Sequence, residues 1–204
     1  MARVIICRHG NTFDKGDLVR RVGARTDLAL SKSGIKQANF LAEQFSPFKS
    51  GYNFSKAYSS TLQRTKSTCS YILSRGHTAV TPNFLNFLKE IDYGPDENKL
   101  ESEVIERIGK KAIELWDSSS TPPQGWLVEP DQIISSWKLF LKSLSDTNDD
   151  ILVVTSNGIA RFLFEAVDNI EIDIQRKLNT ACFGLVKASP GITTLKSWNK
   201  KFIR

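Results

Sequence analysis

The stretch VIICRHGNT, residues 4–12, begins with the β-branched residues Val4, Ile5 and Ile6 and ends in a polar loop. Such a run is typical of a buried strand, and a glycine directly after it allows the chain to turn sharply. Arg8 and His9 are therefore expected at the carboxyl end of a strand. In open α/β sheets ligands bind beyond these ends, so an arginine beside an imidazole indicates an anion site that contains a nucleophile.

Four further motifs follow in the chain. They are GARTDLALSKSG at residues 23–34, YSSTLQRT at 58–65, LKEIDYG at 88–94 and VVTSNG at 153–158. Together with Arg-His-Gly-Asn-Thr at residues 8–12, they resemble in order the motifs of the histidine phosphatase superfamily, also called phosphoglycerate-mutase-like. The resemblance spans nearly the whole chain.

The resemblance implies a specific division of labour around a bound phosphate. His9 would attack phosphorus through a neutral ring nitrogen, and Arg8 and Arg64 would hold the non-bridging oxygens, for which planar guanidinium groups are well suited. Glu90 would protonate the leaving oxygen and then take a proton from the attacking water. The remaining expected phosphate-binding residues are Asn11, Thr12 and Asn157. This chemistry requires no metal and no other cofactor.

Asn157 departs from the pattern, because the family's last motif carries a second histidine that helps to hold the phosphate. An asparagine keeps a donor amide there but cannot carry positive charge as the transition state develops. Loss of one donor from a preorganised site typically lowers the rate by a factor of ~10² to 10³. Two interpretations stay open: a slower or differently tuned phosphatase, and a catalytically inactive protein that binds a phosphate ligand. Retention of His9, Arg8, Arg64 and Glu90 favours activity.

A third interpretation is phosphotransfer of the phosphoglycerate mutase type. In this family, mutases generally carry extra segments that retain a bisphosphorylated sugar acid, and a chain of 204 residues leaves little room for them. We therefore expect hydrolysis of a small phosphorylated metabolite or of a phosphorylated protein side chain. The sequence predicts neither the individual substrate nor the oligomeric state.

The second histidine and the cysteines do not point to other chemistry. His77 is expected to be a solvated residue in a loop between a helix and a strand. A cysteine-based phosphatase needs an arginine six positions after its cysteine, and Phe13 stands six positions after Cys7. The odd number of cysteines, with Cys69 and Cys182 far away in the sequence, favours buried thiols in a reducing compartment.

The net charge of +6 raises the question of a polyanion-binding surface, but Lys and Arg are scattered along the chain, so no nucleic-acid partner is expected. One basic group, made of Lys15, Arg20, Arg21 and Arg25, follows the expected catalytic loop. Either one or two of these residues line the pocket mouth and attract an anionic substrate, or all are solvated.

There is no signal-peptide pattern and no apolar run of the ~20 residues that span a membrane, so we expect a cytoplasmic protein that does not bind membranes.

Composition and periodicity predict one α/β domain over residues 1–204, with 40% hydrophobic content. The expected architecture is a three-layer sandwich, in which a mostly parallel sheet is covered by helices on both faces. The predicted strands are 2–7, 54–58, 78–81, 151–155, 181–187 and 191–197. One helix is predicted to begin at 33–34, and two others are predicted at about 62–73 and 159–167.

Between about residues 95 and 148 the pattern changes to two helical stretches, near 100–116 and 130–144. We predict a helical cap insertion over the active site. Its tryptophans, Trp116, Trp126 and Trp137, are expected to pack in the core rather than to stack on a substrate. Asp96 and Glu97 shape the pocket rim, select a substrate with a positively charged part, or are simply solvated.

Overall fold

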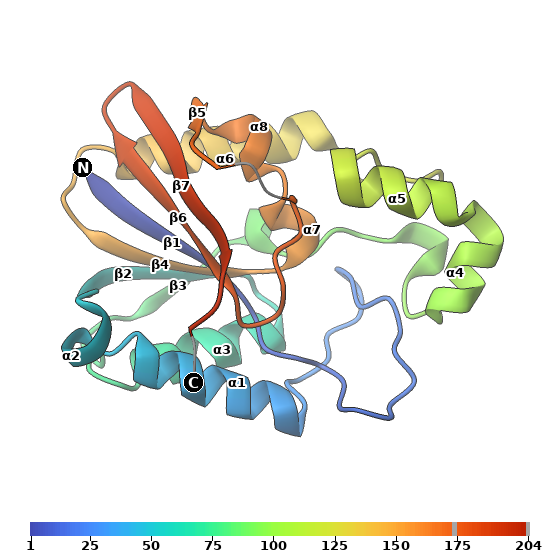
Figure 1. Ribbon diagram of the computed structural model, residues 1–204, viewed down its shortest axis with the longest axis horizontal. Helices are drawn as coiled ribbons and strands as arrows, with labels where there is room; N and C mark the ends of the chain where they lie inside the picture. The colour runs from blue at the N-terminus through green and yellow to red at the C-terminus, as the bar shows by residue number, and fades with distance from the viewer. Residues whose placement is uncertain (173–174, 203–204) are drawn as a thin grey trace.

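The computed structural model describes residues 1–172 and 175–202 and is built around a mixed, seven-stranded sheet in the order β3-β2-β4-β1-β6-β7-β5 (Figure 1). The strands are β1 (Ala2–Arg8), β2 (Phe54–Ser59), β3 (Pro82–Phe84), β4 (Asp150–Thr155), β5 (Asn169–Ile170), β6 (Phe183–Ser189) and β7 (Ile192–Lys200). Neighbours among β3, β2, β4 and β1 pair in parallel, as do β5 and β7, whereas β6 runs antiparallel to both β1 and β7. Among the described strands, the sheet is thus mostly parallel, as predicted.

Helices cover both faces of this sheet. One face packs against α1 (Lys32–Gln44) and α3 (Gln63–Leu73), and the other against α6 (Pro130–Leu144), α7 (Asn157–Ala160) and α8 (Leu163–Ala166) (Figure 1). The short helix α2 (Pro47–Ser50) follows α1. Beyond the carboxyl ends of the parallel strands lie α4 (Glu101–Ile108) and α5 (Lys110–Ser119). The three-layer sandwich predicted from the sequence is confirmed.

Strands β1 and β4 form the centre of the sheet because both are apolar on both faces. In β4, Ile151 and Val153 join one hydrophobic core, and Leu152 and Val154 join the other. Strands buried on both faces have continuous apolar sequences of this kind, without polar alternation. The two strands are parallel with Arg8 opposite Thr155. The motif that follows each strand therefore leaves the sheet at the same edge.

Several predicted elements differ from those observed. The helix expected at 100–116 is interrupted at Gly109, whose φ of +80° is left-handed, and the helix expected at 159–167 divides into α7 and α8. The edge strand expected at 78–81 lies instead at Pro82–Phe84. Helix α6 is not part of a cap, because its buried residues Trp137, Phe140, Leu141 and Leu144 pack on the sheet. The segment that projects from the sheet is therefore α4 and α5.

His77 is buried, and the prediction of a solvated loop residue was wrong. Its side chain is only 3% exposed, Nε2 lies 3.0 Å from the carbonyl oxygen of Phe45, and its ring packs 4.8 Å from the ring of Phe54. A hydrogen bond to a buried backbone carbonyl explains why an imidazole is tolerated there.

The three cysteines are free and buried. No helix of the described chain combines the length and the apolar character that crossing a membrane requires.

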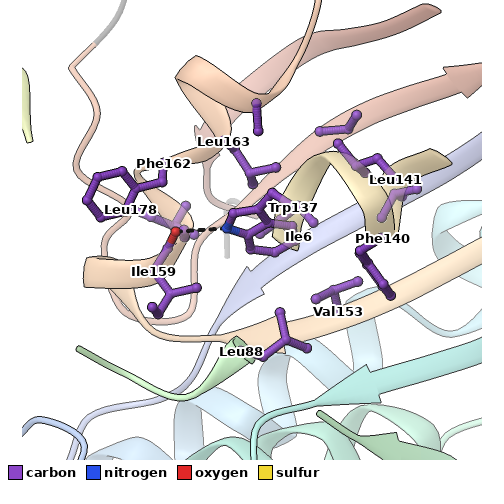
Figure 2. Close-up of a cluster of buried hydrophobic side chains, with 14 of the residues drawn as sticks. Ile6, Leu88, Trp137, Phe140, Leu141, Val153, Ile159, Phe162, Leu163 and Leu178 are labelled. Carbon is purple, nitrogen blue, oxygen red and sulfur yellow. Dashed lines mark hydrogen bonds between the residues drawn. The ribbon is translucent and has the colours of Figure 1, made fainter. Parts of the chain in front are cut away.

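Trp137 connects α6 to the segment that carries the last motif. Figure 2 shows its ring packed among Ile6, Val153 and Leu163, with a hydrogen bond from Nε1 to the carbonyl oxygen of Ile159 at 3.0 Å. Ile159 belongs to α7, which begins at Asn157. Helix α6 therefore fixes the position of this part of the sheet edge.

Replacement of Trp137 by Phe should lower the free energy of unfolding by about 1–3 kcal/mol, because it removes buried ring atoms and leaves the Ile159 carbonyl with only the longer hydrogen bond from the N–H of Phe162. Urea denaturation of both proteins measures the difference. The control is Leu139→Ala on the same helix, where the side chain is 69% exposed, and its effect should stay within ~0.5 kcal/mol. Equal effects of the two substitutions would contradict the assigned role of Trp137.

Candidate active site

A pocket of about 710 Å³ opens beyond the carboxyl ends of β1 and β4. Several parts of the chain form it: the loop after β1, the start of α3, the segment around Glu90, helices α4 and α5, the residues that follow β4, and those that precede β6. Its lining includes Arg8, His9, Asn11, Thr12, Arg64, Glu90 and Asn157. The structure thus brings together all of the residues that the sequence predicted for catalysis and phosphate binding.

His9 lies at the base of this pocket and is only 5% exposed. Its Nδ1 is 2.7 Å from the carbonyl oxygen of Gly10, and since a carbonyl can only accept, Nδ1 carries the ring proton. Nε2 is then unprotonated and accepts a hydrogen bond from Nε of Arg64 at 3.3 Å. Burial lowers the pKa of His9 well below its usual value, and the nearby charges of Arg64 and Arg8 lower it further. The imidazole is therefore neutral, with a lone pair on Nε2.

Two arginines line the pocket together with His9. Arg64, in the first turn of α3, is fully buried, and its Nη1 and Nη2 donate to the carbonyl oxygens of Thr26 and Gly23 at 2.9 and 3.1 Å. Arg8 is partly exposed, and its Nη1 donates to the carbonyl oxygen of Leu178 at 2.8 Å. The carbonyl contacts hold both guanidinium groups in place before any anion binds. Preorganised cations of this kind stabilise charge without reorganisation cost during a reaction.

Glu90 is a buried carboxylate of the site and is 6% exposed. Its Oε1 accepts from the backbone N–H of Ile91 at 2.9 Å, and its Oε2 accepts from that of Gly158 at 3.3 Å. A side chain at position 158 would collide with this carboxylate, since a Cβ would lie 2.2 Å from Oε1. The glycine of the last motif is therefore required for the close approach of Glu90.

Asn157 points its amide group into the pocket. Its Oδ1 accepts from the backbone N–H of Leu178 at 2.8 Å, which assigns Nδ2 as the group left to donate. The same Leu178 accepts from Arg8 through its carbonyl oxygen. One residue of the loop before β6 thus orients Arg8 and Asn157 together, although no sequence pattern marked it.

Close backbone packing positions the loop after β1. A Cβ on Gly34 would lie 2.0 Å from the carbonyl oxygen of Asn11, and one on Gly10 would lie 2.6 Å from that of Gly34. The backbone N–H of Asn11 donates to Gln37 at 2.8 Å, and its side chain donates to Ser33 at 3.3 Å. The start of α1 thus supports the loop that carries Asn11 and Thr12.

The basic residues predicted near the pocket mouth divide into two groups. Lys15, Arg20 and Arg21 line the pocket, but Arg21 is engaged, because it pairs with Glu101 and stacks over Tyr93. Arg25 does not line the pocket and instead donates to Asp92 at 2.9 Å. Lys177 and Thr180, before β6, also line the pocket and were not predicted, since the sequence around them carries no recognisable pattern.

Asp96 and Glu97 are neither solvated nor aimed at a substrate. Asp96 is 2% exposed and accepts from Arg107 and from Trp126 at 2.6 and 2.7 Å. Glu97 accepts from the backbone N–H groups of Gly23 and Arg25, both at 3.0 Å. These carboxylates connect α4 and the loop after β1 to the segment that follows Glu90. Trp116, Trp126 and Trp137 are all buried, as predicted, and Trp116 also lines the pocket.

The chain is similar to several known proteins. The chain is 24% identical over 209 residues to the 2,3-bisphosphoglycerate-dependent phosphoglycerate mutase of Bacteroides fragilis, with 88% of this chain and 83% of the relative covered. Its fold is similar to that of phosphoserine phosphatase from Entamoeba histolytica, solved with 3-phosphoglyceric acid (TM-score 0.74, 21% identity, 98% of both chains covered). It is also similar to a mycobacterial glucosyl-3-phosphoglycerate phosphatase (TM-score 0.76, 19% identity, 98% of this chain and 99% of the other covered).

A family model gives the assignment directly, because it matches residues 4–201 and so includes all five motifs. The resemblance inferred from those motifs is confirmed: this chain belongs to the histidine phosphatase superfamily, branch 1.

Proposed function

We propose that the protein hydrolyses phosphomonoesters through a phosphohistidine intermediate on His9. The observation that carries this proposal is the state of His9: the Gly10 carbonyl holds the proton on Nδ1, and the unprotonated Nε2 accepts a hydrogen bond from Arg64. A neutral imidazole with one available lone pair is a competent nucleophile, and it needs no metal to activate it. The pocket has room for a small phosphorylated metabolite or for a phosphorylated protein side chain.

The first step transfers the phosphoryl group to the protein. Nε2 of His9 forms a bond to phosphorus, and the bond from phosphorus to the leaving oxygen breaks. Glu90, in its acid form, gives its proton to that oxygen. Arg8, Arg64 and the Nδ2 amide of Asn157 stabilise the charge on the three peripheral oxygens, which is the main protein contribution to phosphoryl transfer.

The second step restores the protein. Glu90, now a carboxylate, takes a proton from water as the water oxygen attacks phosphorus. The bond from phosphorus to Nε2 breaks, and inorganic phosphate leaves. The backbone N–H groups of Ile91 and Gly158 keep the carboxylate in place through both steps.

Two alternatives follow from particular observations. Asn157 supplies no positive charge, which favours a protein that binds a phosphate ligand without turnover. Similarity to a phosphoglycerate mutase favours transfer of the phosphoryl group to a second hydroxyl. Hydrolysis is preferred because the residues proposed as nucleophile, acid and cations all line one pocket.

The test is release of inorganic phosphate from a panel of small phosphomonoesters by the wild type and by His9→Ala. The wild type should turn over, and the variant should lose at least ~10³-fold in kcat, because the nucleophile is gone. Phosphohistidine is hydrolysed in acid, so the intermediate should be trapped and digested at alkaline pH. Mass spectrometry of the peptides should then locate it on His9. The control variant is Lys32→Ala, on an exposed part of α1, and under the same conditions its kcat should be unchanged.

The alternatives give different results in the same assay. Binding of phosphate or vanadate by the wild type without any turnover would support the non-catalytic protein and reject the proposal. A requirement for a bisphosphorylated primer, with transfer to a second hydroxyl in place of phosphate release, would support the mutase.

The pH dependence of His9 is a separate prediction. Because the folded pKa of His9 lies below its ordinary value, the unfolded chain binds more protons as the pH falls below about 6.5, and folded stability decreases there. In NMR titrations the His9 ring should stay neutral at about pH 6, where an unperturbed imidazole is mostly protonated. His9→Asn assigns the signal and should remove this part of the stability loss. Titration of His9 at its ordinary pKa would contradict the assigned electrostatics.

Substitutions at Asn157 test its contribution. Asn157→Ala should lower kcat by about 10²-fold, because one preorganised donor is lost. Asn157→Asp should lower kcat further, because it places a negative charge against the phosphate. Asn157→His should raise kcat if the absent imidazole limits the rate, and steady-state kinetics on one substrate compare all three. A slower Asn157→His variant would show that the site is adapted to asparagine.

A further inference from the structure

Arg161 is a fully buried arginine that lies one helical turn after Asn157 and outside the pocket lining. Its guanidinium carbon lies 4.0 Å from the ring centroid of Trp116, and its Nη1 donates to the carbonyl oxygen of the same residue. Its Nη2 lies 3.4 Å from Oδ1 of Asp117. All of these contacts are made to the C-terminal half of α5.

Helix α5 has few other anchors. Of its residues, all of which the structure describes, Trp116 is the buried one. The Trp116 ring meets Trp126 edge-on at 5.3 Å and Phe162 at 6.0 Å, and Arg161 packs over its face. Besides Trp116, the partly buried Ile113 also packs against the core, so the hold on the Trp116 ring is a main anchor of α5.

Both elements that Arg161 joins form walls of the pocket. On one side, α7 begins with Asn157 and Gly158, which contact Leu178 and Glu90. On the other side, Trp116 and Asp117 line the pocket mouth. Both residues belong to α5, which projects from the sheet, and neither takes part in the carbonyl contacts that fix Arg8 and Arg64. With the phosphate held by Arg8, Arg64 and Asn157 as proposed above, Trp116 and Asp117 are lining residues left to contact the leaving group.

A guanidinium is an unfavourable group for merely filling space at such a position. Burial lowers the pKa of Arg161, and Tyr93, Asp117 and Glu90 oppose this effect through their charges. Its Nε is buried without a partner among the described residues. Apolar side chains of similar size commonly replace buried charges with no loss of stability. The planar cation, in contrast, provides a stacking face and directed donors at once, which fixes orientation.

We propose that Arg161 is a positioning residue that holds α5 against the motif loop, and thereby fixes the pocket wall that contacts the leaving group. The part concerning the leaving group rests on the proposed phosphatase function, whereas the coupling of α5 to α7 does not. Loss of Arg161 should weaken binding of esters that carry a leaving group more than binding of a bare phosphate analogue.

The coupling is tested by hydrogen exchange in the full-length wild type, Arg161→Met and Arg161→Lys. Amides of residues 110–119 should exchange about tenfold faster or more in Arg161→Met, because the Trp116 carbonyl keeps only the N–H of Ser120 as a donor and the Trp116 ring loses the cation packed on its face. Amides of the central strands should be unchanged. The control is Arg3→Met at the opposite end of β1, where the arginine also stacks on an aromatic ring (4.9 Å from Tyr52) and pairs with Asp150. If wild type and Arg161→Met are both folded and their amides in residues 110–119 exchange at the same rate, the proposal is overturned.

The consequence for binding is tested with two probes, orthovanadate and 4-nitrophenyl phosphate. In Arg161→Met, KM for the ester should rise about tenfold, whereas the inhibition constant of vanadate should change less than about twofold. The reason is that a misplaced pocket wall mainly affects the ligand group that it contacts. Arg161→Lys should lie between Arg161→Met and wild type, because it keeps a donor and the charge but not the planar face. Equal losses for both probes, or none for either, would overturn the positioning role.

Failure of the phosphatase function is recognised separately. If the wild type does not turn over, calorimetric binding of the same two probes replaces the kinetic comparison. A selective loss of ester binding in Arg161→Met then supports the positioning role in a binding protein, and the absence of a selective loss overturns it. The exchange experiment is valid in either case.

Discussion

The parallel pairing of β1 with β4 is the interaction on which the site depends. Arg8 lies opposite Thr155 in this pairing, so the residues that follow both strands emerge side by side. His9 and Asn157 come from positions far apart in the chain, yet neither needs a long loop to reach the other. The apolar side chains of the two strands, buried in both cores, are what keep this register. Since a shift of one residue would exchange the two faces of a strand, the cores also fix the active site.

Much of the site could be predicted because its chemistry is local in sequence. Arg8, His9 and Gly10 stand at a strand end, and Arg64 stands in the first turn of a helix, where anions are favoured. Other parts depend on tertiary contacts that no local pattern records. Leu178 acts through its backbone, and Arg161 acts through a helix more than 40 residues earlier in the chain.

The errors have equally physical origins. His77 has the sequence surroundings of a surface loop, and only the position of the Phe45 carbonyl makes its burial favourable. Helix α6 was assigned to a cap because it follows an irregular segment. Its apolar stripe instead completes the cover of the sheet, as the Trp137 cluster shows. Asp96 and Glu97 look like turn residues, but their partners come from α4 and from the loop after β1.

The hydrogen bond from Arg64 to Nε2 of His9 has a consequence for the empty protein. The N–H of the arginine occupies the lone pair that attacks phosphorus in the proposed reaction, so the nucleophile is shielded until that N–H finds another acceptor. In the proposed reaction the oxygens of a bound phosphate provide such an acceptor, and the donor turns from the nitrogen to the ligand. Recognition of the anion and exposure of the nucleophile are then one event. A passing electrophile without a phosphate group meets an imidazole that is already engaged.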